Sequence, residues 1–217
     1  MAKTPLTRDR ALAAAMALAD NNGLSAVTMR RLAKELNVEA MSVYHHIPNK
    51  EALLDGMVDR VYSEVSRPEP GDEWRSAMQD RAKSLRDALV RHPWAVGLLD
   101  SRTSPGPETL KHLDANIGCL RENGFSWEMT AHAYSVIDAY VFGFAIQQVQ
   151  MPFESTEETQ ALAADMVAAM EDAYPQLSAF ALSHVMKPGY DYASEFDYGL
   201  ELILSGLEQD LVNHDSD

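Results

Sequence analysis

Apolar residues recur along this chain at spacings of three and four positions, which is the periodicity of an amphipathic helix. Strict alternation of apolar and polar residues, the pattern of a half-buried strand, is absent from the sequence. Glycine and proline fall between the periodic runs and mark their ends. We therefore predict an all-α protein, with helices, caps included, over residues 7–23, 28–36, 39–47, 49–66, 72–91, 108–123, 126–150, 155–174, 176–184 and 192–212.

The run Arg-Pro-Glu-Pro-Gly at residues 67–71 interrupts the helical pattern and changes the local composition. We place a domain boundary there. The prediction is a three-helix, helix-turn-helix DNA-binding domain over residues 1–66, followed by a helical ligand-binding and dimerisation domain over residues 67–217.

Charge is distributed unevenly along the chain, whose formal net charge is -15. Residues 1–66 carry eight basic and eight acidic residues, so the remaining 10 basic and 25 acidic residues lie beyond them. A near-neutral front part can approach phosphate, whereas an acidic rear part is repelled by it. The single cysteine, Cys119, excludes an internal disulfide and a cysteine-based metal cluster within one chain.

The N-terminal segment has one feature of a secretion signal, because Lys3, Arg8 and Arg10 precede an apolar run at residues 11–19. Asp9 interrupts the basic region, and residues 20–23 have the sequence of a helix end, so an amphipathic helix is the better interpretation. No apolar run approaches the roughly 20 residues that a membrane span needs. We expect a cytoplasmic protein without membrane contact.

Residues 28–47 have the pattern of a helix-turn-helix. Asn37 lies at the turn, where a left-handed residue is needed and asparagine is the best choice after glycine. An ordinary helical hairpin has the same spacing, so the pattern alone leaves both structures open. The apolar faces of the two helices are formed by Leu32, Ala33 and Leu36, and by Val38, Val43 and Ile47.

Residues 23–54 resemble the signature of the TetR family, the family of the tetracycline repressor, especially in the run Val-Tyr-His-His-Ile-Pro-Asn-Lys-Glu-Ala-Leu-Leu at residues 43–54. The likeness to the repressor itself continues at Trp74 and at residues 82–84, 124–126 and 199–208. The resemblance implies a transcriptional regulator, most simply a repressor, which binds a palindromic DNA operator as a homodimer and is released by a small-molecule inducer.

The resemblance also assigns DNA contacts. Thr28 and Tyr44 have hydroxyls that can donate to phosphate, Lys50 lies at the start of the next helix, and Arg30 can contact phosphate or guanine. The remaining predicted contacts, to bases or backbone, are Ala40, Met41, Ser42, His45 and His46; the first two make only apolar contacts.

Each of these assignments has a plainer alternative. His45 and His46 could form a metal pair, but adjacent helical residues point in different directions. Tyr44 could belong to the core, although Val43 and Ile47 already supply the inner face. Arg31 and Lys34 fit a solvated face better than a DNA contact.

The homodimer is predicted from residues 139–146 and 199–207, which are apolar on nearly all sides. A helix that is apolar all round must be buried all round, so one face needs a partner beyond the chain's own core. Gly143, Gly199 and Gly206 would allow close helix approach. The alternative is a large, self-contained monomer core.

A mainly apolar effector pocket is expected inside the second domain. Arg81, Asn116, His132 and Gln147 would supply its polar contacts, and Arg81 would welcome a carboxylate or phenolate. For any single apolar residue, plain core packing is the alternative. The apolar lining is predicted to come from Met78, Leu85, Leu98, Leu99, Leu113, Ile117, Met129, Val136 and Tyr140.

The family prototype holds magnesium–tetracycline through two histidines and a glutamate. At the matching positions this chain has Leu99 (or Asp100, with a register shift of one), Ala139 and Gln147. Leucine and alanine cannot bind magnesium, and glutamine lacks the charge that a hard cation prefers. We therefore predict no metal site, no cofactor and an inducer other than magnesium–tetracycline.

Two other classes of function remain as alternatives. An enzyme would need a catalytic constellation, but the sequence has no Glu-x-x-His pair, glycine-rich phosphate loop or nucleophile motif, and Glu128 with His132 fits a salt bridge or a pocket wall. A DNA-binding regulator or architectural protein without a ligand is the second alternative, and the large second domain argues against it.

Overall fold

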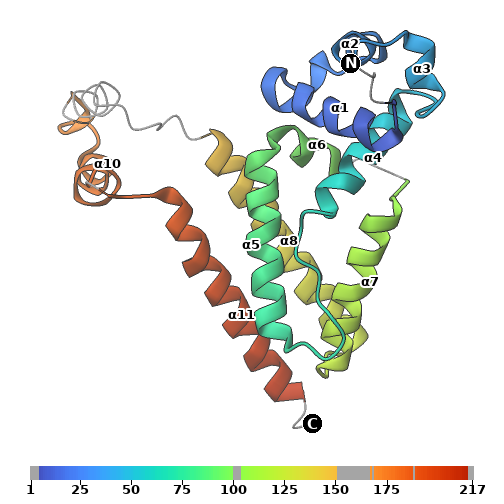
Figure 1. Cartoon of the computed structure of the whole chain (residues 1–217). Coiled ribbons are helices and arrows are strands. Elements are labelled where there is room, and N and C mark those ends of the chain that lie inside the picture. The colour runs from blue at the N-terminus through green and yellow to red at the C-terminus, as the bar shows by residue number, and fades with distance from the viewer. Residues whose placement is uncertain (1–4, 100–103, 151–166, 168, 188, 215–217) are drawn as a thin grey trace. The chain divides into compact units, whose positions relative to one another are not determined.

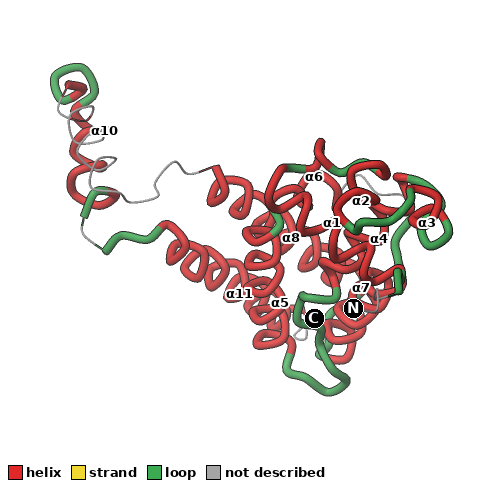
Figure 2. The backbone as a smooth tube through the Cα atoms, turned by 45° about the horizontal axis from the view of Figure 1, so that its top comes forward, coloured by secondary structure: helices red, strands yellow, loops and turns green. Residues whose placement is uncertain are grey.

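The computed structural model describes residues 5–99, 104–150, 167, 169–187 and 189–214, and these residues contain helices and loops but no strand (Figures 1 and 2). The all-α prediction is confirmed. None of the described helices is long and apolar enough to cross a membrane. The first helices are α1 (Arg8–Asn22), α2 (Met29–Glu35), α3 (Ala40–Tyr44) and α4 (Lys50–Tyr62).

After the first four, the described helices are α5 (Trp74–Arg91), α6 (Val96–Leu99), α7 (Pro107–Glu122), α8 (Trp127–Gln150), α10 (Pro175–Phe180) and α11 (Glu195–His214). The longest helices of the described residues are α5, α7, α8 and α11, and short 3₁₀ segments precede α6 and α11, at Pro93–Ala95 and Tyr192–Ser194. The predicted helix over residues 176–184 divides into a short α-helix and a π-helix at Ala181–Val185.

Contacts divide the chain into two compact units, Met1–Val149 with Leu200–Asp217, and Gln150–Gly199. Within the first unit, we call residues 8–62 (α1 to α4) the head, and residues 74–149 with 200–214 the body; α4 leads from one to the other (Figure 1). This division does not coincide with the boundary predicted after residue 66, so the two-domain organisation stays a prediction.

Local chemistry explains where the head helices begin. The hydroxyls of Thr7 and Thr28 accept the backbone N–H groups of Arg10 and Arg31 at 3.2 and 3.1 Å, and Asn49 Oδ1 accepts the N–H of Ala52 at 2.8 Å. Each side chain thereby satisfies one of the N–H groups that a helix start leaves unpaired. The predicted caps Thr7, Thr28 and Asn49 are thus confirmed.

The third helix is shorter than predicted, because it ends at Tyr44 instead of reaching residue 47. The N–H of His46 donates to the carbonyl of Val43 at 3.0 Å, which tightens the last turn, and Pro48 prevents continuation. The predicted capping box at residues 155–158 lies outside the described residues.

The body has a core of large apolar side chains between α5, α7 and α8. Trp74 packs edge-on against Phe125, with ring centroids 4.9 Å apart. Met78, Leu85 and Ile137 are fully buried. This packing fixes the register of α5 against α7 and α8, and so positions the polar side chains described below.

Candidate nucleic-acid interface and effector site

The helix-turn-helix forms because the turn between α2 and α3 brings their apolar faces together. Asn37 has φ 52°, so the left-handed turn residue predicted from the sequence is confirmed. The N–H of Val38 donates to the carbonyl of Ala33 at 3.0 Å and closes the turn. Leu32, Val43 and Ile47 are buried beneath it, which leaves the opposite face of α3 in solvent.

Most of the predicted DNA contacts are exposed on the head. Met41 and Tyr44 keep 66% and 41% of their surface in solvent, although large apolar and aromatic side chains are usually buried. Tyr44 therefore does not serve as a core residue in this chain. Thr28, Arg30, His45, His46 and Lys50 are also exposed, whereas Ala40 and Ser42 are half-buried.

The two basic residues assigned to a solvated face behave differently from each other. Arg31 Nη2 donates to Asn22 Oδ1 at 2.8 Å and holds the start of α2 against the end of α1. Lys34 is exposed. Among the described residues, no group of three His, Cys, Asp or Glu side chains is placed to hold a metal ion.

The predicted effector residues divide according to the helix face on which they lie. His132, Val136 and Gln147 are on the solvent-facing side of α8, where His132 Nε2 lies 3.7 Å from Glu128 Oε1, as the salt-bridge interpretation required. Ile117 is exposed on α7, and Leu99, Leu113 and Tyr140 are half-buried. The structure buries Met78, Arg81, Leu85, Leu98, Asn116 and Met129.

A buried polar cluster, formed by Arg81, His112, Asn116, Tyr134 and Asp138, lies between α5, α7 and α8. Arg81 Nε donates to His112 Nε2 at 3.1 Å, and Arg81 Nη2 donates to Asp138 Oδ1 at 2.6 Å. The guanidinium carbon lies 5.0 Å from the ring centroid of Tyr134, in cation–π distance. Asn116 Nδ2 donates to the backbone carbonyl of His112 at 2.6 Å.

Sequence reasoning found Arg81 and Asn116 but missed His112, Tyr134 and Asp138. His112 precedes Asn116 by one helical turn, and Tyr134 precedes Asp138 by one turn, so both pairs share a helix face. This spacing was a signal, but a polar side chain at such a position is more often solvent-exposed. Only packing tells the two cases apart.

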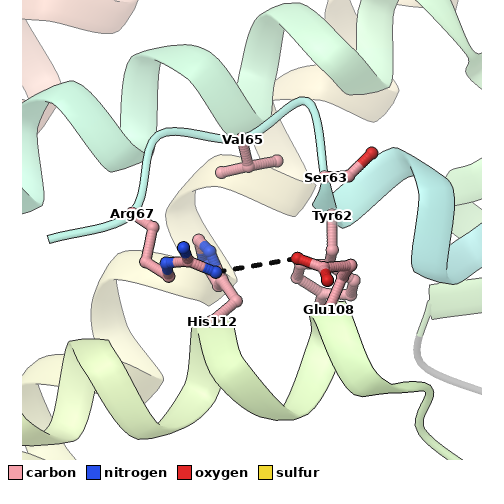
Figure 3. A pocket seen from close by; sticks show the side chains of 6 residues that line it. All are labelled: Tyr62, Ser63, Val65, Arg67, Glu108 and His112. Carbon is pink, nitrogen blue, oxygen red and sulfur yellow. Dashed lines mark ion pairs between the residues drawn. The ribbon is translucent and has the colours of Figure 1, made fainter.

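A small cavity of about 140 Å³ lies where the end of α4 and the following loop meet α7. Figure 3 shows the residues that line it, with the ion pair between Arg67 and Glu108, whose Nη1 and Oε2 atoms are 3.6 Å apart. His112 belongs both to this cavity and to the buried polar cluster. The lining residues are Tyr62, Ser63, Val65, Arg67, Glu108 and His112.

Asp59 of α4 joins the head to the body. Its Oδ1 accepts the backbone N–H of Thr109 at 2.9 Å and the hydroxyl of Thr109 at 3.1 Å, and so caps the first turn of α7. A carboxylate at a helix N-terminus is also favoured by the helix dipole. Gly106 makes this approach possible, because a Cβ there would overlap the Asp59 carboxylate.

A second group of hydrogen bonds links α1 to the segment before α6. Trp94 Nε1 donates to Asp20 Oδ1 at 2.6 Å, and His92 Nδ1 lies 2.8 Å from the same oxygen. Glu64 Oε2 lies 3.3 Å from His92 Nε2 and also pairs with Arg91. Both contacts tie head helices to the body: the first to α7, which also carries His112 and Asn116, and the second to the segment that follows α5.

The chain combines an exposed helix-turn-helix with a helical body that contains a buried polar cluster. This combination is that of DNA-binding regulators with a sensing region. Residues 11–57 match the family described as bacterial regulatory proteins of the tetR family, and residues 67–211 match the tetracyclin repressor-like C-terminal domain. The chain belongs to the TetR family of transcriptional regulators.

Curated relatives agree with this assignment over nearly the full chain. The HTH-type transcriptional repressor DrrR1 of Streptomyces coeruleorubidus is 32% identical, over 95% of this chain and 78% of the relative. The class D tetracycline repressor protein of Escherichia coli is 29% identical, over 95% and 91%.

Solved structures agree as well. Apo ActR of Streptomyces coelicolor matches with a TM-score of 0.76 and 28% identity, over 98% of this chain and all of that chain. The complex of ActR with actinorhodin matches with a TM-score of 0.74 and 29% identity, over 94% and 96%.

Proposed function

We propose that this chain is a ligand-responsive repressor, which binds a palindromic operator as a homodimer and releases it when a small molecule enters the body. The observation that carries the proposal is the buried polar cluster in a body that contacts the exposed helix-turn-helix domain through Asp59 and Thr109. We assign DNA binding to residues 1–66, and ligand binding and dimerisation to residues 67–217. The chain acts in the cytoplasm as a regulator and not as an enzyme.

DNA recognition is assigned to the exposed face of α3 and to the starts of α2 and α4. The Thr28 hydroxyl accepts the N–H of Arg31 and still has a proton to donate to phosphate. Tyr44 and Lys50 add phosphate contacts, which set the register without reading sequence, and Arg30 contacts phosphate or guanine. Contacts to bases or backbone come from Ala40, Met41, Ser42, His45 and His46, and the first two make only apolar contacts, such as with thymine methyl groups.

The homodimer is proposed from the apolar side chains that α8 and α11 leave in solvent. Ile146, Val149, Leu202 and Val212 have between 40% and 62% of their surface exposed. Apolar surface gathered on two helices is typical of a protein interface. A twofold dimer would present two α3 helices to two half-sites, which is why we expect an inverted repeat.

Coupling between effector and operator is assigned to the joint between Asp59 and Thr109. His112 and Asn116 lie on α7, within two turns of the residue that Asp59 caps. A ligand that moves α7 therefore moves α4, and with it the head. The ligand acts by stabilising one separation of the two heads over the other.

The effector is a small organic molecule other than magnesium–tetracycline. An organic effector is supported by the structural neighbour ActR, which was solved in complex with actinorhodin. Ala139 and Gln147, at two positions where the family prototype holds its metal, are exposed, and Leu99 is half-buried; Asp100 lies outside the described residues. Calorimetry with tetracycline and magnesium is expected to give no binding in the micromolar range or tighter, whereas a tight magnesium-dependent isotherm would refute this part.

DNA binding is tested with a duplex enriched by the protein from random sequences. We expect the double variant Thr28→Ala/Tyr44→Ala to lose its footprint while its thermal melting stays that of the parent. An unchanged footprint would count against the assignment. A small-molecule screen for operator release then separates the classes: release supports a sensor, turnover supports an enzyme, and no effect supports a regulator without a ligand.

A further inference from the structure

Three side chains of the buried polar cluster each retain a polar atom without a hydrogen-bond partner among the described residues. These atoms are Arg81 Nη1, His112 Nδ1 and Asn116 Oδ1. The three residues are 1%, 1% and 0% exposed, so almost none of their surface is in solvent. Since an unpaired buried polar group destabilises a fold, three of them in one cluster indicate groups kept for a ligand.

The existing hydrogen bonds decide which of these atoms donate. His112 Nε2 accepts a proton from Arg81 Nε, so the neutral imidazole carries its own proton on Nδ1, which therefore donates. Arg81 Nη1 can only donate. Asn116 Nδ2 already donates to a backbone carbonyl, and its Oδ1 accepts. These three unpaired atoms are thus two donor atoms and one acceptor atom.

The charges within the cluster already balance. Asp138 neutralises Arg81 at 2.6 Å, a pairing that the sequence did not reveal. Burial and the positive charges of Arg81 and Arg67 lower the pKa of His112 from 6.5 to about 3, so its ring is neutral. Burial and the charge of Asp138 raise the pKa of Tyr134, so its phenol stays protonated. A charged ligand would be buried without a counter-ion, which is costly.

We propose that the effector is an uncharged molecule with two hydrogen-bond-accepting oxygens and one hydroxyl donor. Arg81 Nη1 and His112 Nδ1 bind the accepting oxygens, and Asn116 Oδ1 accepts the hydroxyl proton. This inference rests on the proposed sensing function, and it replaces the carboxylate or phenolate expected from Arg81 alone. The cavity at His112 gives the molecule a place to approach the ring (Figure 3).

The test compares three probes that share one aromatic frame: 3′-hydroxyacetophenone, acetophenone and 3-hydroxybenzoate. Ligand-observed NMR gives their dissociation constants for the full-length chain. We expect 3′-hydroxyacetophenone to bind about 2- to 10-fold more tightly than acetophenone, the range of one hydrogen bond, and 3-hydroxybenzoate to bind most weakly. Tighter binding of the carboxylate, or no binding of any probe, overturns the inference.

Asn116→Leu, close in volume, removes the acceptor. We expect it to abolish the preference for the hydroxyl probe over acetophenone, and Asn21→Leu, the same change at an exposed position of α1, to leave that preference unchanged. If Asn116→Leu does not fold, the order of the three probes on the parent chain still decides. Operator binding and its release by a small molecule are measured separately. If the three probes bind in a different order while a small molecule still releases the operator, only the proposed ligand class is refuted. If the chain binds no operator, the proposed function is refuted.

Discussion

Lys50 is exposed at the first position of α4, and we assign it to a phosphate contact. Lys50→Ala is expected to weaken operator binding uniformly across sequences, and to lower the slope of log affinity against log salt by about 0.9, the value for one lost phosphate contact. Fluorescence anisotropy at several salt concentrations measures both quantities.

Lys34→Ala is the matched control, since Lys34 carries the same charge on the solvated face of α2. It is expected to leave the slope unchanged. Equal slopes for both variants would remove Lys50 from the interface.

His112 gives the stability of the protein a predictable pH dependence. Its pKa falls from 6.5 to about 3 on folding, because burial and Arg81 disfavour the charged ring. Between these values the unfolded chain binds a proton that the folded chain does not, so His112 lowers stability as the pH falls below 6.5 and has no such effect above it. At pH 5 the loss is about 2 kcal/mol.

His112→Leu removes this contribution. Urea unfolding at pH 7.5 and pH 5 is expected to give a fall in unfolding free energy that is about 2 kcal/mol smaller in the variant than in the parent. The exposed His132→Leu is the control and is expected to keep the parental fall. A parental pH dependence in His112→Leu would mean that the ring is protonated inside the cluster.

At the scale of elements, the contact between α4 and α7 depends on one glycine. Gly106→Ala places a Cβ on the Asp59 carboxylate, and we expect it to destabilise the protein by about 1–3 kcal/mol, as overpacking does. Gly118→Ala, inside α7 and with open space around it, is the control, and is expected to be neutral or slightly stabilising.

The same pair of variants tests the coupling. Once the operator has been identified, Gly106→Ala is expected to change the affinity for it, whereas Gly118→Ala is expected to leave this affinity unchanged. Unchanged stability and unchanged operator affinity in Gly106→Ala would show that the Asp59 joint does not link head and body.

Helix existence was largely predictable from the sequence, because caps such as Thr28 and Asn49 and the left-handed Asn37 carry their structural requirement in their own chemistry. The end of α3 was not predictable, because the helical spacing continues to Ile47 while the backbone tightens at Val43, where the N–H of His46 donates to its carbonyl. The polar cluster was predictable only in part. Arg81 lies on the same helix face as the apolar Met78 and Leu85, and this spacing indicated an inward position, but burial of His112 and the ion pair with Asp138 result from tertiary packing. His132, Val136 and Gln147 were assigned to the pocket because helical spacing alone does not tell an inner face of α8 from an outer one.

At the scale of the whole molecule, the dimer is tested through α11. Leu202 is 60% exposed, and Leu202→Glu is expected to convert the dimer to a monomer at micromolar concentration in sedimentation velocity, since a buried unpaired carboxylate disfavours association. Leu110→Glu on α7, where Leu110 is 52% exposed, is the control and is expected to stay dimeric. A monomeric parent protein would refute the interface.

The symmetry of the preferred DNA tests the central claim most directly, because it depends on the head, the dimer and their geometry together. Random duplexes are selected by the parent protein and sequenced. The account predicts one enriched inverted repeat, with half-sites whose centres are one helical turn of DNA or a multiple of it apart. An enriched sequence without twofold symmetry, or no enrichment, would contradict it.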